Sequence, residues 1–130
     1  MDKVELISVT KGYEIYPHLT ETYTFDTLAE RKDKIISYSD AVLVLPGGYG
    51  TIDEMLTVVS AKANKLIDKP IAIYNYKGYF KTLEKFFNEL EEKKFSKIRF
   101  DEIALVSEDL DKILAYFRSY SSTTLADKFI

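Results

Sequence analysis

The feature that most constrains this chain is residues 41–54, where a strand, a glycine-rich loop and the start of a helix follow one another directly. Five apolar residues, Ala41 to Leu45, show no alternation, as in a strand buried on both faces of a parallel sheet. Pro46 ends the strand, and the three glycines that follow within four positions permit positive φ angles and close approach of the backbone. Thr51 then opens a helical repeat with apolar residues at Ile52, Met55, Leu56 and Val59.

This order of elements is typical of an anion site. It directs several backbone N–H groups and the positive end of a helix dipole at one point. We therefore predict that the backbone of Gly47, Gly48 and Gly50, together with the hydroxyl and amide of Thr51, binds a phosphate group. A glycine turn that serves only strand–helix packing would give the same pattern, so this alternative stays open.

Residues 46–54 read Pro-Gly-Gly-Tyr-Gly-Thr-Ile-Asp-Glu and fit the PGGxGTxxE signature of the LOG ("lonely guy") family, which is often labelled lysine decarboxylase. The chain resembles this family from about residue 25 to residue 110. Three further segments carry the resemblance: Glu30-Arg31-Lys32 followed by Ser39-Asp40-Ala41, then Asp68-Lys69-Pro70-Ile71, and finally Asn75 to Phe80.

The resemblance implies a phosphoribohydrolase that needs no cofactor and no metal. Such an enzyme hydrolyses a nucleoside 5′-monophosphate, here AMP or an N6-modified AMP, to free base and ribose 5-phosphate. The family's catalytic glutamate would be Glu54, which stabilises the ribosyl cation or orients water, and its catalytic arginine would be Arg31. Arginine can hold a phosphate or ribose oxygen bidentately. Lys32 and Tyr49 would be further substrate-binding residues, Tyr49 by stacking on the base.

Each of these roles has a structural alternative. Thr51 and Glu54 have the spacing of a capping box, in which Glu54 would only stabilise the helix by accepting from the Thr51 amide. Arg31 and Lys32 could be exposed helix charges. For the whole protein, the alternatives are a nucleotide-binding or sensing protein without catalysis and a family member without a working site.

The alternation of strands and helices predicts an α/β fold, a Rossmann-like three-layer sandwich with a small, mostly parallel sheet of about four strands. We expect strands at residues 4–9, 41–45, 71–74 and 103–106, and helices over 26–37, 51–65, 83–90 and 110–117. Ligands bind beyond the carboxyl ends of such strands, where the loops 10–24, 46–51, 75–79 and 107–108 should lie. The helix over 26–37 runs antiparallel to the strands, which brings Arg31 towards the glycine loop.

The chain reads as one truncated domain over residues 1–130, with a tail from about residue 120. LOG relatives begin with two additional strand–helix units, so we expect either a fragment or a surface completed by another subunit. The sheet edge and apolar helix faces left uncovered predict a homo-oligomer, most simply a dimer. The resemblance also implies pairing around the active site.

Composition excludes several other classes. The net charge is −3 with both signs mixed, which argues against nucleic acid as a partner. No apolar run approaches the ~20 residues of a membrane span. Cysteine is absent and His18 is the single histidine, so thiolate sites and a histidine-pair metal site are excluded within one chain. We expect a cytoplasmic location.

Overall fold

Four parallel strands form the sheet of this protein, as seen in a computed structural model that describes residues 4–7 and 27–121. The strands are β1 (Val4–Ile7), β2 (Ala41–Val44), β3 (Ile71–Tyr74) and β4 (Leu105–Ser107). They pair in chain order, β1-β2-β3-β4, and every pairing is parallel. The predicted α/β class and the number of strands are confirmed.

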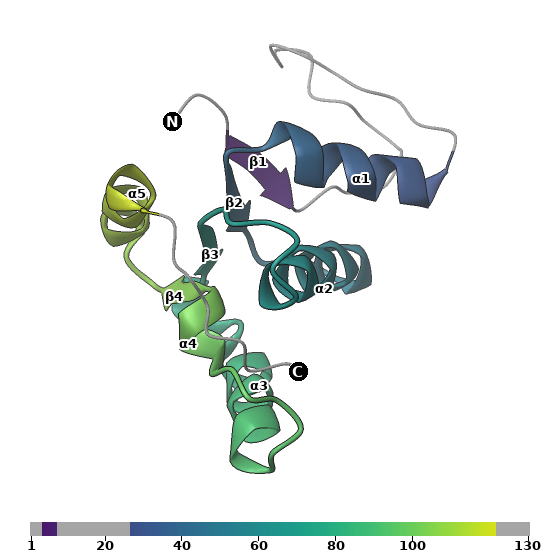
Figure 1. Ribbon diagram of the computed structural model, residues 1–130. Coiled ribbons are helices and arrows are strands. Elements are labelled where there is room, and N and C mark those ends of the chain that lie inside the picture. Colours follow the sequence, from purple (N-terminus) through teal and green to yellow (C-terminus); the bar gives the residue numbers. More distant parts are fainter. Residues whose placement is uncertain (1–3, 8–26, 122–130) are drawn as a thin grey trace.

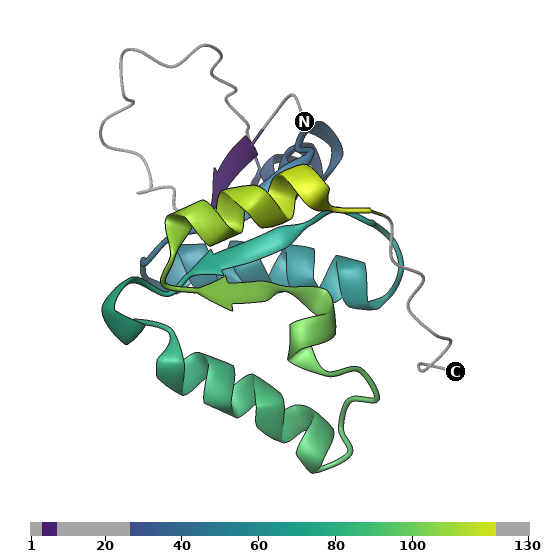
Figure 2. The same cartoon turned by 90° about the vertical axis from the view of Figure 1, so that its left-hand side faces the viewer.

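Helices cover both faces of this sheet. They are α1 (Leu28–Tyr38), α2 (Tyr49–Ala63), α3 (Lys81–Glu92), the single turn α4 (Phe100–Ile103) and α5 (Leu110–Ser119), with a 3₁₀ turn η1 (Tyr76–Gly78) after β3. In Figure 1, α1 and α2 lie on one side of the strands and α5 on the other. Figure 2 is seen from the α5 side and shows α2 behind the strands. This is the predicted three-layer sandwich.

The strand β2 divides the core in two. Val42 and Val44 face a cluster that includes Met55 and Val58 of α2, whereas Ala41 and Leu43 face Ile113 and Phe117 of α5. All four residues of β2 are buried, which confirms the interpretation of the unbroken apolar run. Because β2 is held from both sides, the loop that follows it starts from a fixed point.

Two helix starts follow local capping rules. Thr27 accepts a hydrogen bond from the backbone N–H of Glu30 at 3.2 Å and caps α1. Asp109 caps α5 by accepting from the N–H groups of Asp111 and Lys112. The α1 cap fixes where the helix that carries Arg31 begins.

The structure corrects the expected strand over residues 103–106. Residues 100–103 form the turn α4 and the strand begins only at Leu105. Phe100 and Ile103 are one helical turn apart and both are buried in the core cluster, which favours a helical turn over an extended segment. Leu56, which belongs to the apolar repeat predicted for its helix, is exposed, and so are Phe86 of α3 and Leu110 of α5.

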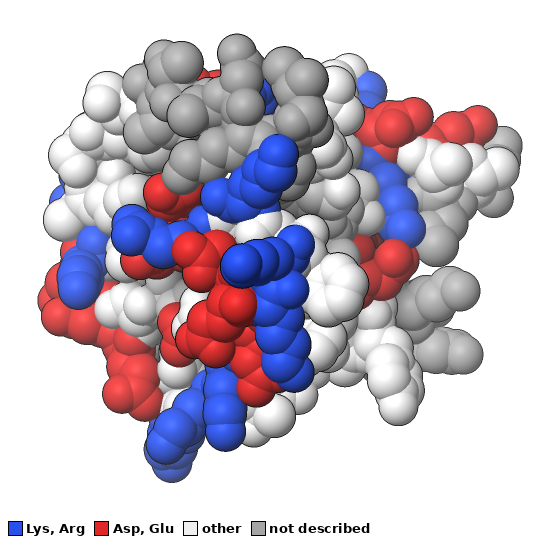
Figure 3. All heavy atoms as spheres, turned by 60° about the horizontal axis from the view of Figure 1, so that its bottom comes forward, with Lys and Arg blue, Asp and Glu red and all other residues white. Residues whose placement is uncertain are grey.

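Some predictions fall outside the described residues. These are the connection over 10–24 with His18, the last residues of the strand expected over 4–9, and the tail beyond residue 121. Within the described part, no helix is both long enough and apolar enough to cross a membrane. On the face seen in Figure 3, the lysine and arginine side chains are interspersed with aspartate and glutamate.

Candidate functional site

The glycine loop lies where predicted, between the carboxyl end of β2 and the first turn of α2. Gly48 is the N-cap of α2, and its carbonyl oxygen accepts the first helical hydrogen bond from the Ile52 N–H at 3.1 Å. No side chain caps this end of the helix. The first N–H groups of α2 and the positive end of its dipole are therefore available to an anion.

The glycines of this loop do not use positive φ angles, which corrects one premise of the sequence argument. Among the described glycines, only Gly78 has a positive φ. Gly47 is required by close approach instead, because a Cβ there would overlap the side chain of the buried Thr51. A Cβ on Gly48 or Gly50 would meet no atom within 4 Å, so the space beside these two residues is open to a ligand.

The capping-box interpretation of Glu54 is wrong. The helix begins at Tyr49, two residues earlier than expected, so Thr51 is in its first turn and not at its N-cap. The capping partner in such a box lies three residues after the N-cap, and with Gly48 as N-cap that position is Thr51. Glu54 is thus free of a capping role.

Glu54 instead forms an ion pair with Arg31. The Arg31 Nη2 contacts the Glu54 Oε1, and the side chain of Glu54 is only 2% exposed while that of Arg31 is 23% exposed. Glu54 Oε2 and Arg31 Nε are buried without a hydrogen-bond partner among the described residues. Buried polar atoms in proteins usually have hydrogen-bond partners, and these two can accept and donate one hydrogen bond each.

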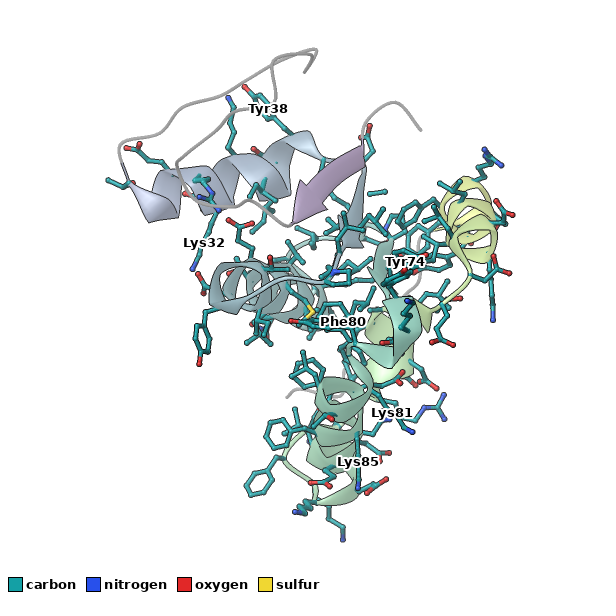
Figure 4. All side chains as sticks on the ribbon, turned by 180° about the vertical axis from the view of Figure 1, so that it is seen from behind. Lys32, Tyr38, Tyr74, Phe80, Lys81 and Lys85 are labelled. Carbon is teal, nitrogen blue, oxygen red and sulfur yellow. The ribbon has the colours of Figure 1, made fainter. Side chains whose placement is uncertain are left out.

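A second ion pair runs beside the first. Lys32 Nζ lies 2.9 Å from Asp53 Oδ1 and 2.8 Å from Asp53 Oδ2. Figure 4 shows the Lys32 side chain leaving α1 in the direction of α2. Asp53 is half exposed, so this pair contributes little to stability. The two pairs show that α1 brings both basic residues to the first turns of α2, as the antiparallel course of the helix predicted.

Tyr49 and the loop after β3 complete the surroundings. The Tyr49 side chain is 94% exposed at the first position of α2, so a base stacked on it would remain largely in solvent. The Tyr79 hydroxyl donates a hydrogen bond of 2.6 Å to the carbonyl oxygen of Gly47. The loop 75–79 was expected at this edge of the sheet, but no role was predicted for Tyr79. The parallel pairing of β2 with β3 places the loops that follow these strands next to each other. Tyr79 is therefore close enough to reach the glycine loop.

Comparisons with known proteins identify the family. Residues 4–117 match the model of the family described as "possible lysine decarboxylase". The chain belongs to this family. It is 30% identical over 92 residues to the cytokinin riboside 5′-monophosphate phosphoribohydrolase LOG4 of Arabidopsis thaliana, covering 71% of this chain and 43% of the relative. It is 38% identical over 66 residues to LOG1 of the same plant, covering 51% of this chain and 31% of the relative.

A rice relative gives the same result. The probable cytokinin riboside 5′-monophosphate phosphoribohydrolase LOGL6 of Oryza sativa subsp. japonica is 32% identical over 92 residues, covering 71% of this chain and 37% of the relative. The chain thus spans less than half the length of these curated relatives. The matched range includes Arg31, the glycine loop and Glu54, so the resemblance seen in the sequence is confirmed at the level of the family.

Three side chains with shifted pKa values lie away from Arg31, Glu54 and the glycine loop, at the edge of the sheet where the strands begin. Burial lowers the pKa of Lys62 to about 8, although Asp68 opposes the shift, and the Lys62 Nζ lies 4.8 Å from the centre of the Tyr120 ring. Burial also lowers the pKa of Lys69 and raises that of Tyr116. In residues 4–7 and 27–121, no three His, Cys, Asp or Glu side chains are grouped as metal ligands.

Proposed function

We propose that this protein is a phosphoribohydrolase that cleaves the N-glycosidic bond of AMP or of an N6-substituted AMP. The observation that carries the proposal is the buried Glu54, ion-paired to Arg31 of α1, in the helix that begins at the glycine loop. A carboxylate of α2 and a guanidinium of α1 are paired here, and no side chain caps the first N–H groups of α2. The two Arabidopsis relatives are named phosphoribohydrolases and the rice relative a probable one, which supports the same reaction.

In the proposed reaction the 5′-phosphate binds at the N-terminus of α2. The amides of Gly48, Gly50 and Thr51 are the donors, and the open space beside both glycines gives a phosphate access to the backbone. Gly47 contributes by allowing Thr51 to pack against the loop. This arrangement uses fixed dipoles, which lose no entropy when the substrate binds.

Hydrolysis then breaks the bond between C1′ and the base nitrogen. The base leaves with the bonding electrons and takes up a proton, and positive charge develops on the ribose. Water adds its oxygen to C1′ and gives up one proton, which balances the proton taken up by the base, and the product is ribose 5-phosphate. Glu54 stabilises that charge or orients the water. Arg31 pairs with Glu54 in the free protein and, in the complex, donates from its remaining N–H groups to a phosphate or ribose oxygen. Lys32 adds positive charge beside Arg31.

A binding protein without catalysis is the second candidate. The observation in its favour is that the Glu54 side chain is 2% exposed and already engaged by Arg31. A carboxylate that never leaves this pair would hold the site together without reaching C1′. The same glycine loop would then bind a nucleotide without turnover.

The deciding experiment is to incubate the protein with AMP and with an N6-substituted AMP. Free base should be released, detected by chromatography, together with an equal amount of ribose 5-phosphate. Calorimetry with AMP is run in parallel. Tight binding without release of base would favour the binding protein, and neither binding nor release at millimolar ligand would overturn both candidates.

We also propose that the chain forms a homodimer. The large apolar side chains Leu56 of α2 and Phe86 of α3 are exposed on helices that cover the same face of the sheet. A dimer interface formed by the solvent-facing sides of α2 and α3 would bury both side chains. A two-fold dimer is the simplest closed arrangement. Light scattering at micromolar concentration should give twice the mass of one chain. The mass of a single chain would contradict the proposal.

A further inference from the structure

The loop between β3 and α3 is a closed structure that presents one tyrosine to the glycine loop. The Asn75 N–H donates to the carbonyl oxygen of Ser107 at 2.8 Å, which ties the loop to the end of β4. The Asn75 side chain accepts from the Phe80 N–H at 2.7 Å and closes the loop from the other side. Gly78, with φ at +74°, permits the turn between them.

The ring of Tyr79 is held by this loop. It contacts Phe80 edge to face, with ring centroids 4.9 Å apart. Phe80 is buried in the core cluster and in Figure 4 lies in the interior between α2 and α3. The contact with Phe80 orients the Tyr79 ring. The Tyr79 hydroxyl donates a hydrogen bond of 2.6 Å to the carbonyl oxygen of Gly47, which lies 32 residues earlier in the chain.

The direction of the Gly47 carbonyl determines the direction of the next N–H. A trans peptide unit is planar, and its C=O and N–H point in opposite directions. No cis peptide is present among the described residues, so fixing the Gly47 oxygen towards Tyr79 fixes the Gly48 N–H on the opposite side. Gly48 has no Cβ to favour one orientation of this peptide, and no atom lies within 4 Å of where a Cβ would be. Local sterics alone therefore leave the peptide orientation open.

We propose that Tyr79 is a positioning residue that sets the Gly47–Gly48 peptide so that the Gly48 N–H faces the substrate phosphate. The hydroxyl does not touch the substrate and acts only through the Gly47 carbonyl. This inference rests on the proposed phosphate site at residues 47–51. The proposed phosphate site would then be formed by two loops, the glycine loop after β2 and the loop after the neighbouring strand β3.

The test compares Tyr79→Phe with Tyr76→Phe. Each variant removes one hydroxyl and keeps the ring, and the two tyrosines of this loop are 55% and 49% exposed. The structure records no hydrogen bond for the Tyr76 side chain among the described residues, so Tyr76→Phe is the matched control. Ribose 5-phosphate is the ligand for calorimetry. Its affinity should fall about five-fold in Tyr79→Phe, because the Gly48 N–H would no longer be held towards the phosphate and its hydrogen bond to the ligand would be weakened, and remain unchanged in Tyr76→Phe.

A second readout separates positioning from folding. With only five glycines, the glycine amides of the chain can be resolved in a ¹⁵N–¹H spectrum. In the wild type, ribose 5-phosphate should shift the Gly48 amide, and this shift should shrink in Tyr79→Phe while the melting temperature changes little. Equal affinity and equal shifts in wild type and Tyr79→Phe would overturn the role of Tyr79 and leave the phosphate site standing. Absence of ribose 5-phosphate binding to the wild type would overturn both.

Discussion

Replacement of Glu54 by glutamine should lower the rate of base release from AMP or an N6-substituted AMP by at least ~100-fold, a typical loss for a positioned acid–base or electrostatic group. The amide has nearly the size of the carboxylate and can still accept a hydrogen bond from Arg31 through its oxygen. It carries no charge to stabilise the ribosyl cation. Steady-state rates of base release measured by chromatography check the prediction, and calorimetry should show that binding of AMP is largely kept.

Asp53→Asn is the matched control for this prediction. Asp53 precedes Glu54 in the same helix, and its carboxylate also pairs with a basic residue of α1, but the pair is solvent-exposed. Loss of this charge should change the rate by no more than a few-fold, since exposed ion pairs contribute little. If Glu54→Gln released base as fast as the wild type, Glu54 would serve only to hold Arg31 in place.

The parts of the fold that follow from local chemistry could be predicted from the sequence. The unbroken apolar run followed by Pro46 favours a strand buried on both faces, and the structure has β2 there. The side chains of Thr27 and Asp109 each accept from N–H groups two or three residues later. The helix expected over 110–117 begins where α5 does, and the helix expected over 26–37 begins two residues before α1. Rules of this kind need no knowledge of distant residues.

The start of α2 could not be predicted in the same way. Tyr49 and Gly50 have weaker helix propensity than most residues, and Thr51 with Glu54 has the spacing of a capping box. The structure extends the helix to Tyr49 because Gly47 and Gly48 lead the backbone into it while Thr51 packs against Gly47. That packing decides that Glu54 meets Arg31 instead of the helix backbone.

The contact between the loops after β2 and β3 could not be predicted from the sequence either. The sequence predicts that the loops after β2 and β3 lie at one edge of the sheet, but it does not say which side chain crosses between them. Gly78 with its positive φ, the Asn75 bond to Phe80 and the packing of Tyr79 on Phe80 together decide that Tyr79 reaches Gly47. Each of these is a turn conformation or a tertiary contact, and the spacing of apolar residues along the sequence carries no information about it.

Arg31→Ala should have the largest effect on stability. It removes the partner of a carboxylate that is 2% exposed, so Glu54 would remain buried with an uncompensated charge. Loss of one partner of a buried pair costs on the order of 3 kcal/mol, a large part of the 5–15 kcal/mol that stabilises a typical domain. Urea unfolding should show a lower midpoint with an unchanged slope. The affinity for ribose 5-phosphate should fall as well, because Arg31 is a proposed phosphate or ribose ligand.

Two further variants show whether the unpaired charge is the cause. Lys32→Ala removes the neighbouring basic residue of α1, whose partner Asp53 is half exposed, and should cost at most ~1 kcal/mol. The double variant Arg31→Ala with Glu54→Gln has no unpaired carboxylate at this position. It should recover most of the stability lost in Arg31→Ala, although the ribose 5-phosphate affinity should stay low. If Arg31→Ala were no less stable than Lys32→Ala, the ion pair would not be what keeps Glu54 buried beside the glycine loop.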